Sequence, residues 1–163
     1  MRALTPPPAS PNPPGRDTER RLSHPGLFYP GGMSGTFELP IAIEREDIDQ
    51  LGHVNNVTYV RWVQQAAEAH WRAAAPAEDQ AKLLWIVLRH EIDYIGAAHA
   101  GDGIKARTWV GSARGLRFER FTEFERASDG KVLAKARTIW CPVDAGKGKP
   151  VAVSEAVREC FSV

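Results

Sequence analysis

The chain has little of what marks several common protein classes. Its 163 residues contain only two cysteines, Cys141 and Cys160, and these show no metal-ligand spacing. No apolar run approaches the ~20 residues of a membrane span. No apolar segment follows Arg2, so a signal peptide is not indicated. We therefore expect two reduced thiols, no membrane partner and a cytoplasmic location.

An excess of charge of either sign is also missing. The chain has 21 basic and 20 acidic residues, which gives a net charge of +1, and it has no basic block. Proteins that bind nucleic acid usually carry a basic patch or stripe. We therefore expect no nucleic-acid partner.

Proline is abundant in one place only, the first thirty residues, where aliphatic residues are sparse. Such a segment cannot bury a core of its own, so we predict a disordered tail over residues 1–35. Met33 is the true initiator in one interpretation, and the tail is a real flexible arm in the other. Residues 36–163 are long enough for one domain with a sizeable core.

The stretch 47–59, DIDQLGHVNNVTY, concentrates chemistry in a few residues. It holds two carboxylates, a glycine, an imidazole and three side-chain amides, and it runs straight into an alanine-rich helical pattern. An aspartate near such a turn can act as base or nucleophile. The free backbone N–H groups of the helix start can hold a developing oxyanion.

The flanking patterns predict the fold. Alternating apolar residues predict a strand over 36–45, and apolar residues at helical spacing predict a helix from about 55 to 75, with Asn55 as N-cap and Pro76 as stop. Further strands are expected over 86–94, 104–112, 116–126 and 132–143, with a short helix over 154–161. Short turns make consecutive strands antiparallel, so the fold class is α+β, with one long helix packed on an antiparallel five-stranded sheet.

The loop Asp49-Gln50-Leu51-Gly52-His53-Val54-Asn55-Asn56, with Tyr59 and Trp62 after it, resembles the hot-dog-fold acyl-CoA thioesterases, and most closely their 4-hydroxybenzoyl-CoA thioesterase-like branch. The resemblance covers about residues 36–155. It implies a homodimer or homotetramer with sites at the subunit interface. It also implies hydrolysis of an acyl-CoA thioester to a free acid and CoA, with no metal and no cofactor.

The same resemblance implies roles for particular residues. Asp49 matches the catalytic carboxylate, as general base or nucleophile, and Gly52 matches the turn glycine. The backbone N–H of Asn56 matches the group that polarises the thioester carbonyl. His53 can orient Asp49, contact substrate or hold the loop, while Asn55 and Tyr59 are candidates for substrate binding. Core packing is the commoner role for a residue such as Tyr59.

Two related motifs match less well. Another hot-dog branch carries its catalytic carboxylate as a glutamate on the helix, where Glu68 is the only loose match. Acyl-carrier-protein thioesterases of plants have a loop that reads Asp-x-Asn-x-His, and here Leu51 replaces the Asn. That departure weakens the prediction of a carrier-protein substrate.

Outside the loop, arginines and tryptophans offer weaker candidates. Arg114 and Arg117, near Arg120 in sequence, are candidates for the phosphates of CoA, although an ordinary charged strand face explains them as well. Tryptophans fall in strand segments and either line an acyl pocket or fill the core: Trp85, Trp109 and Trp140. A non-hydrolytic acyl-CoA-binding module and an acyl-carrier-protein thioesterase are the alternatives for the whole protein.

Overall fold

The computed structural model describes residues 35–161 of the chain. The predicted disordered tail and the question of Met33 as initiator lie outside these residues. The described residues coincide with most of the predicted domain.

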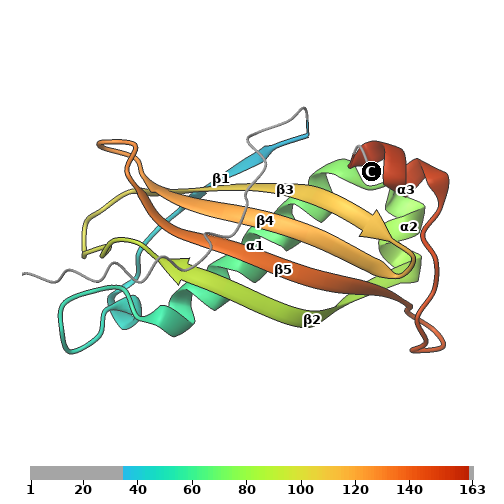
Figure 1. Cartoon of the computed structure of the whole chain (residues 1–163), viewed down its shortest axis with the longest axis horizontal. Helices are drawn as coiled ribbons and strands as arrows, with labels where there is room; N and C mark the ends of the chain where they lie inside the picture. The colour runs from blue at the N-terminus through green and yellow to red at the C-terminus, as the bar shows by residue number, and fades with distance from the viewer. Residues whose placement is uncertain (1–34, 162–163) are drawn as a thin grey trace, which may run out of the picture.

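Five antiparallel strands form one sheet in the order β1-β3-β4-β5-β2. The strands β3, β4 and β5 are consecutive hairpins, as their short turns predict, while β1 and β2 lie at opposite edges (Figure 1). Their bounds are β1 Phe37–Ile41, β2 Leu83–Tyr94, β3 Ile104–Arg114, β4 Arg117–Arg126 and β5 Val132–Asp144.

One long helix, α1 (Asn56–Ala74), runs along a single face of this sheet (Figure 1). Asn55 caps it by accepting a hydrogen bond from the Val57 N–H at 2.9 Å, and the helix ends before Pro76. Its buried positions follow the spacing of one helical face, where small alanines keep the helix slim. These buried residues are Thr58, Tyr59, Trp62, Val63, Ala66, Ala67 and His70.

The α+β layout predicted from the sequence is confirmed, with differences at the element ends. The first strand ends at Ile41, because the chain turns into a short 3-10 helix over Arg45–Asp47. Pro76, the predicted stop of the long helix, is also the N-cap of a second short helix that was not predicted from the sequence, α2 (Ala77–Lys82). The terminal helix, α3 (Glu155–Cys160), begins after Ser154, whose side chain caps it.

The core between helix and sheet divides into two clusters. The first packs the N-terminal half of α1, including Tyr59, Trp62 and Val63, against the sheet around Phe124. The second lies at the other end of the sheet and includes Phe118, Val157 and Phe161, with Trp71, Trp85 and Trp140 packed against it. Cross-strand ion pairs cover much of the opposite sheet face, such as Lys135 with Glu123 at 2.8 Å.

Candidate active site

The loop that precedes α1 is a tight turn closed by backbone hydrogen bonds. The Asp49 N–H donates to the His53 carbonyl at 2.8 Å, and the Gly52 N–H donates to the Asp49 carbonyl at 3.1 Å. Gly52 has a φ of 76°, a left-handed conformation that costs a residue with a side chain more than it costs glycine. The left-handed conformation of this turn thus gives a physical reason for a glycine at position 52 of the motif.

Asp49 holds this turn with one carboxylate oxygen. Its Oδ1 accepts the Leu51 N–H at 2.8 Å and the His53 N–H at 3.2 Å. Within residues 35–161 the other oxygen, Oδ2, has no hydrogen-bond donor. The capping role and a chemical role are therefore compatible, because one oxygen is fixed and the other is available to a bound molecule.

The start of α1 supplies an unused donor beside this loop. The Asn55 side chain takes the Val57 N–H, and the Asn55 carbonyl takes the Thr58 N–H at 2.9 Å. The Asn56 N–H has no acceptor in the part of the chain that the structure describes. A helix start also favours negative charge through its dipole.

Asp47, the other carboxylate of the stretch 47–59, has a structural role. Its side chain completes a capping box with Glu44 and is buried, with 1% of the residue exposed. It also accepts from the Thr58 hydroxyl at 3.2 Å and pairs with Arg61. Asp47 therefore fixes the loop to the first two turns of α1. In the sequence, the only sign of this role was a hydroxyl and a cation nearly one helical turn apart, Thr58 and Arg61, which can both reach one carboxylate.

His53 lies between the loop and the segment that follows β2. It forms an isolated bridge with His99, and the two imidazoles meet edge to face with centroids 5.0 Å apart. The His99 N–H donates to Asp102 at 2.9 Å, and this bond, with the nearby Arg126, lowers the pKa of the Asp102 carboxyl. His53 thus packs against a well-anchored neighbour rather than standing alone in solvent.

The other predicted site residues lie elsewhere in this protomer. Tyr59 is buried in the first core cluster, against Trp62. Glu68 is exposed on α1 and pairs with Arg72, about 18 Å along the axis from Asn56 at 1.5 Å per residue. Arg114 and Arg117 are opposite each other in the β3–β4 strand register, next to the turn. This turn is at the end of the sheet away from the Asp49 loop (Figure 1).

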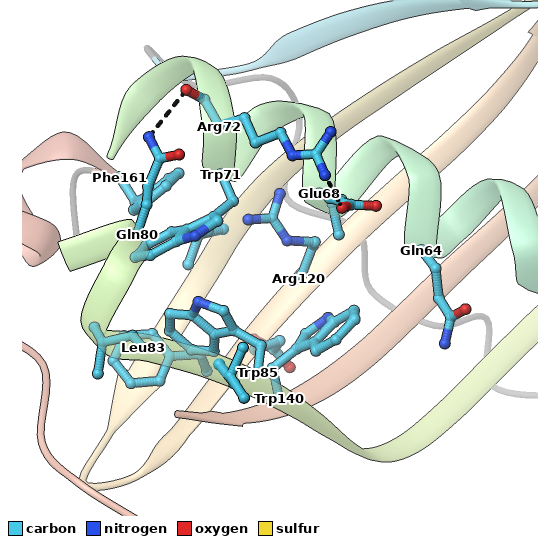
Figure 2. A pocket seen from close by; sticks show the side chains of 15 residues that line it. Gln64, Glu68, Trp71, Arg72, Gln80, Leu83, Trp85, Arg120, Trp140 and Phe161 are labelled. Carbon is cyan, nitrogen blue, oxygen red and sulfur yellow. Dashed lines mark hydrogen bonds and ion pairs between the residues drawn. The ribbon is translucent and has the colours of Figure 1, made fainter. Parts of the chain in front are cut away.

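A cavity of about 490 Å³ opens at that same far end, between the C-terminal half of α1 and the sheet. Glu68 and Arg72 border it from the helix, and Trp85, Trp140 and the buried Arg120 border it from the strands (Figure 2). Trp109 does not border it and instead stacks on Phe121. Of the three strand tryptophans, two therefore line a cavity and one does not.

No cluster of three or more potential metal ligands occurs among residues 35–161. Over the same residues, no helix has the length and hydropathy to span a bilayer.

Comparison with known families gives one match over most of the chain. A family model described as the thioesterase-like superfamily matches residues 43–161. The acyl-CoA thioesterase YbgC of Haemophilus influenzae is 27% identical over 133 residues, a match that covers 79% of this chain and 96% of that protein.

Solved structures share the fold at low sequence identity. A thioesterase from Thermus thermophilus, complexed with coenzyme A and zinc, aligns with a TM-score of 0.68 and 21% identity, over 79% of this chain and 94% of that one. Slr0204, a 1,4-dihydroxy-2-naphthoyl-CoA thioesterase from Synechocystis, aligns with a TM-score of 0.68 and 19% identity, over 78% and 96%. These likenesses confirm the predicted hot-dog fold.

Proposed function

Because the chain belongs to the thioesterase-like superfamily, we propose that it hydrolyses an acyl-CoA thioester to a free carboxylic acid and CoA. The relative YbgC is named for that activity, and a structural neighbour was solved with coenzyme A. One observation carries the assignment of the machinery: an aspartate with a free oxygen and a helix start with a free N–H belong to the same eight-residue loop.

In the proposed reaction, the thioester carbonyl oxygen accepts the Asn56 N–H, which stabilises the negative charge that develops on it. As general base, Asp49 takes a proton from water through Oδ2 while the water oxygen attacks the carbonyl carbon. The C–S bond then breaks, and the CoA thiolate leaves and takes up a proton. The fixed Oδ1 holds the carboxylate in one orientation throughout.

As nucleophile, Asp49 instead attacks the carbonyl carbon with Oδ2 and forms a mixed anhydride that water hydrolyses. A single turnover in H₂¹⁸O separates the general-base route from an anhydride that water opens at the aspartyl carbon. The general-base route places ¹⁸O in the acid product of the first turnover. Water attack on the aspartyl carbon of an anhydride leaves that first product unlabelled and puts the ¹⁸O into Asp49.

We further propose that the enzyme is a homodimer or a homotetramer built from dimers joined along β2. This edge strand exposes three aliphatic side chains, Leu84, Ile86 and Leu88, and an exposed apolar edge is a template for pairing. A two-fold axis would pair β2 with its copy in antiparallel fashion. Within one protomer, Arg114 and Arg117 lie at the end of the sheet away from the Asp49 loop (Figure 1). In such a dimer, each Asp49 loop would lie towards the partner's Arg114 and Arg117.

Two further features fit a cytoplasmic enzyme that acts on acyl-CoA. Both cysteines are free thiols, Cys141 buried and Cys160 exposed, which fits a reducing compartment such as the cytoplasm. The exposed arginines of the β3–β4 turn, Arg114 and Arg117, fit the phosphates of CoA.

The test is the release of free thiol from a panel of aromatic, short-chain and long-chain acyl-CoAs. Asp49→Asn is the preferred variant, because its Oδ1 still accepts the Leu51 and His53 N–H groups and the loop is kept. Loss of a general base typically costs 10²–10⁴-fold, so we expect kcat/KM to fall by at least about 100-fold. No turnover by the wild type on any acyl-CoA would favour a carrier-protein substrate or a binding module instead.

A further inference from the structure

The cavity at the far end of α1 contains a buried cation that no acid of the described chain neutralises. Arg120 on β4 has 8% of its surface exposed, and within residues 35–161 it forms no ion pair. The two carboxylates that border the cavity are already paired, Glu68 with Arg72 and Glu119 with Arg137. The guanidinium carbon of Arg120 lies 5.8 Å from the centroid of the Phe161 ring, but no anion of the described chain faces it. A buried charge without an anionic partner is costly, so its position calls for an explanation.

The polar neighbours of Arg120 are neutral. Its Nη1 donates to the Thr108 hydroxyl at 3.2 Å and lies 3.0 Å from the His70 Nδ1. Burial, and then the charge of Arg120, lower the pKa of His70 to about 4, so the imidazole is uncharged at neutral pH and Nδ1 is the acceptor. Burial lowers the pKa of Arg120 to about 10, which leaves it charged. Its Nη2 and Nε have no acceptor in the described chain.

Two further donors in the cavity wall are also unused. Within the described chain, the indole N–H groups of Trp85 and Trp140 are buried and have no hydrogen-bond partner. Figure 2 shows Arg120 in the middle of the cavity, between the α1 side chains on one side and these two indoles on the other. Aromatic rings form one part of the wall: Trp71 meets Trp85 edge to face with centroids 5.4 Å apart, and Trp85 meets Phe118 at 5.1 Å.

We propose that this cavity binds a small organic carboxylate with an aromatic or aliphatic body. The carboxylate would accept from Arg120 and from an indole N–H, while the body packs against Trp71, Trp85 and Phe118. A carboxylate both neutralises the charge of Arg120 and offers oxygen acceptors for its unused N–H groups. The volume, about 490 Å³, falls within the range of small-molecule sites.

The binding of a carboxylate does not depend on the proposed hydrolysis, whereas the assignment of its source by kinetics rests on the proposed function. The same chemistry has two sources, a free organic acid and a terminal carboxylate on an acyl chain that enters from the catalytic loop of a partner subunit. Binding of an unreactive acid tests the cavity, and the kinetics of paired substrates distinguish the sources.

The binding experiment uses 2-naphthoate and octanoate, with 2-naphthamide and octanamide as uncharged counterparts, by titration calorimetry and tryptophan fluorescence. We expect each acid to bind at least about tenfold more tightly than its amide, in line with the strength of hydrogen bonds to charged groups. Arg120→Met should remove this preference. Arg107→Met, which alters an arginine outside the cavity that pairs with Glu125, should retain it.

If Arg120→Met fails to fold by circular dichroism, Arg120→Lys takes its place, because it keeps the charge but loses the fork of donors and should weaken binding less. Equal affinity for acid and amide, or an acid affinity that Arg120→Met leaves unchanged, would overturn the proposal. For the source, kcat/KM is compared for glutaryl-CoA and its uncharged pentanoyl counterpart. A loss in Arg120→Met confined to glutaryl-CoA assigns the carboxylate to the acyl chain, and equal kinetics assign it to a free acid.

Discussion

The two ends of α1 are held by different kinds of interaction. At its start, the Asp49 loop is shaped by hydrogen bonds between residues two to four positions apart, such as Leu51 to Asp49. At its other end, the cavity is shaped by aromatic side chains from separate strands and helices, such as Trp71, Trp85 and Phe161. The first region places polar groups at the end of a helix dipole, and the second buries a cation in an apolar wall.

The contrast shows which region can carry chemistry and which can carry selectivity. In the proposed mechanism, a fixed carboxylate oxygen and a backbone donor would act on any thioester that reaches them. The proposed carboxylate site around Arg120, with two indole donors that are unused within the described chain, would instead discriminate between bound groups. On this account, changes at the loop alter turnover for all substrates, whereas changes at the cavity alter binding or stability.

After the loss of the Asp49 carboxylate, the largest expected effect comes from removing the Asn56 N–H itself. Asn56 is the first residue of α1, where proline is well tolerated, and Asn55 has φ −63° and ψ 141°, a conformation compatible with a following proline. Asn56→Pro should therefore keep the helix and lower kcat by about 10²–10³-fold, the usual cost of an oxyanion donor. Steady-state kinetics with circular dichroism measure both.

Asn56→Ala is the matched control, because it removes the side chain and keeps the N–H. We expect its kcat to stay within a few-fold of the wild type. Equal activity in Asn56→Pro and Asn56→Ala would mean that the oxyanion is bound elsewhere.

At the cavity end, we expect His70 to make the free energy of unfolding depend on pH. The pKa of His70, about 4 in the folded protein, lies below the 6.5 of an unperturbed histidine. Between these values the unfolded chain binds more protons, so the free energy of unfolding falls as pH falls. From pH 7 to pH 5 this contribution amounts to about 2 kcal/mol.

His70→Asn should remove that contribution, because its amide oxygen can accept from Arg120 and does not titrate. Urea unfolding at pH 7 and pH 5 measures the change. The variant is expected to lose less stability than the wild type between the two values. A loss equal to that of the wild type would show that His70 is not held neutral by its surroundings.

The smallest expected effect comes from disrupting the proposed dimer edge along β2, which would bring the Asp49 loop of one subunit towards the cavity end of its partner. Ile86 on β2 is 49% exposed, and Ile86→Lys places a charge in the proposed dimer edge. We expect dissociation to monomers by light scattering and a loss of about tenfold in activity, smaller than the loss from an oxyanion donor. Ala73→Lys, on the exposed side of α1, is the control. A wild type that is monomeric and fully active would contradict the interface.

Local signals made the first region predictable from the sequence. The loop content, the Asn55 cap, the helix stop at Pro76 and the strand alternation all act over a few residues, and the structure confirms the elements they predict. The assignment of Asp49 and Asn56 to catalysis stays a prediction, because the fold places these groups without a substrate.

Long-range packing made the second region unpredictable. Arg120 is close to Arg117 in sequence, but strand alternation sends it under α1, where His70 and Thr108 meet it. Nothing within a few residues of Trp85 or Trp140 indicates that both border one cavity. The Asp47–Arg61 pair was missed for the same reason, since its partners lie 14 residues apart.

The most direct test compares two aspartates that cap turns in the same way. Asp49 accepts the Leu51 and His53 N–H groups, and Asp144 at the end of β5 accepts the Gly146 and Lys147 N–H groups. Thiol release by Asp49→Asn and Asp144→Asn is measured side by side. We predict a loss in kcat/KM of at least about 100-fold for Asp49→Asn and wild-type activity for Asp144→Asn. Wild-type activity in Asp49→Asn would contradict the central claim.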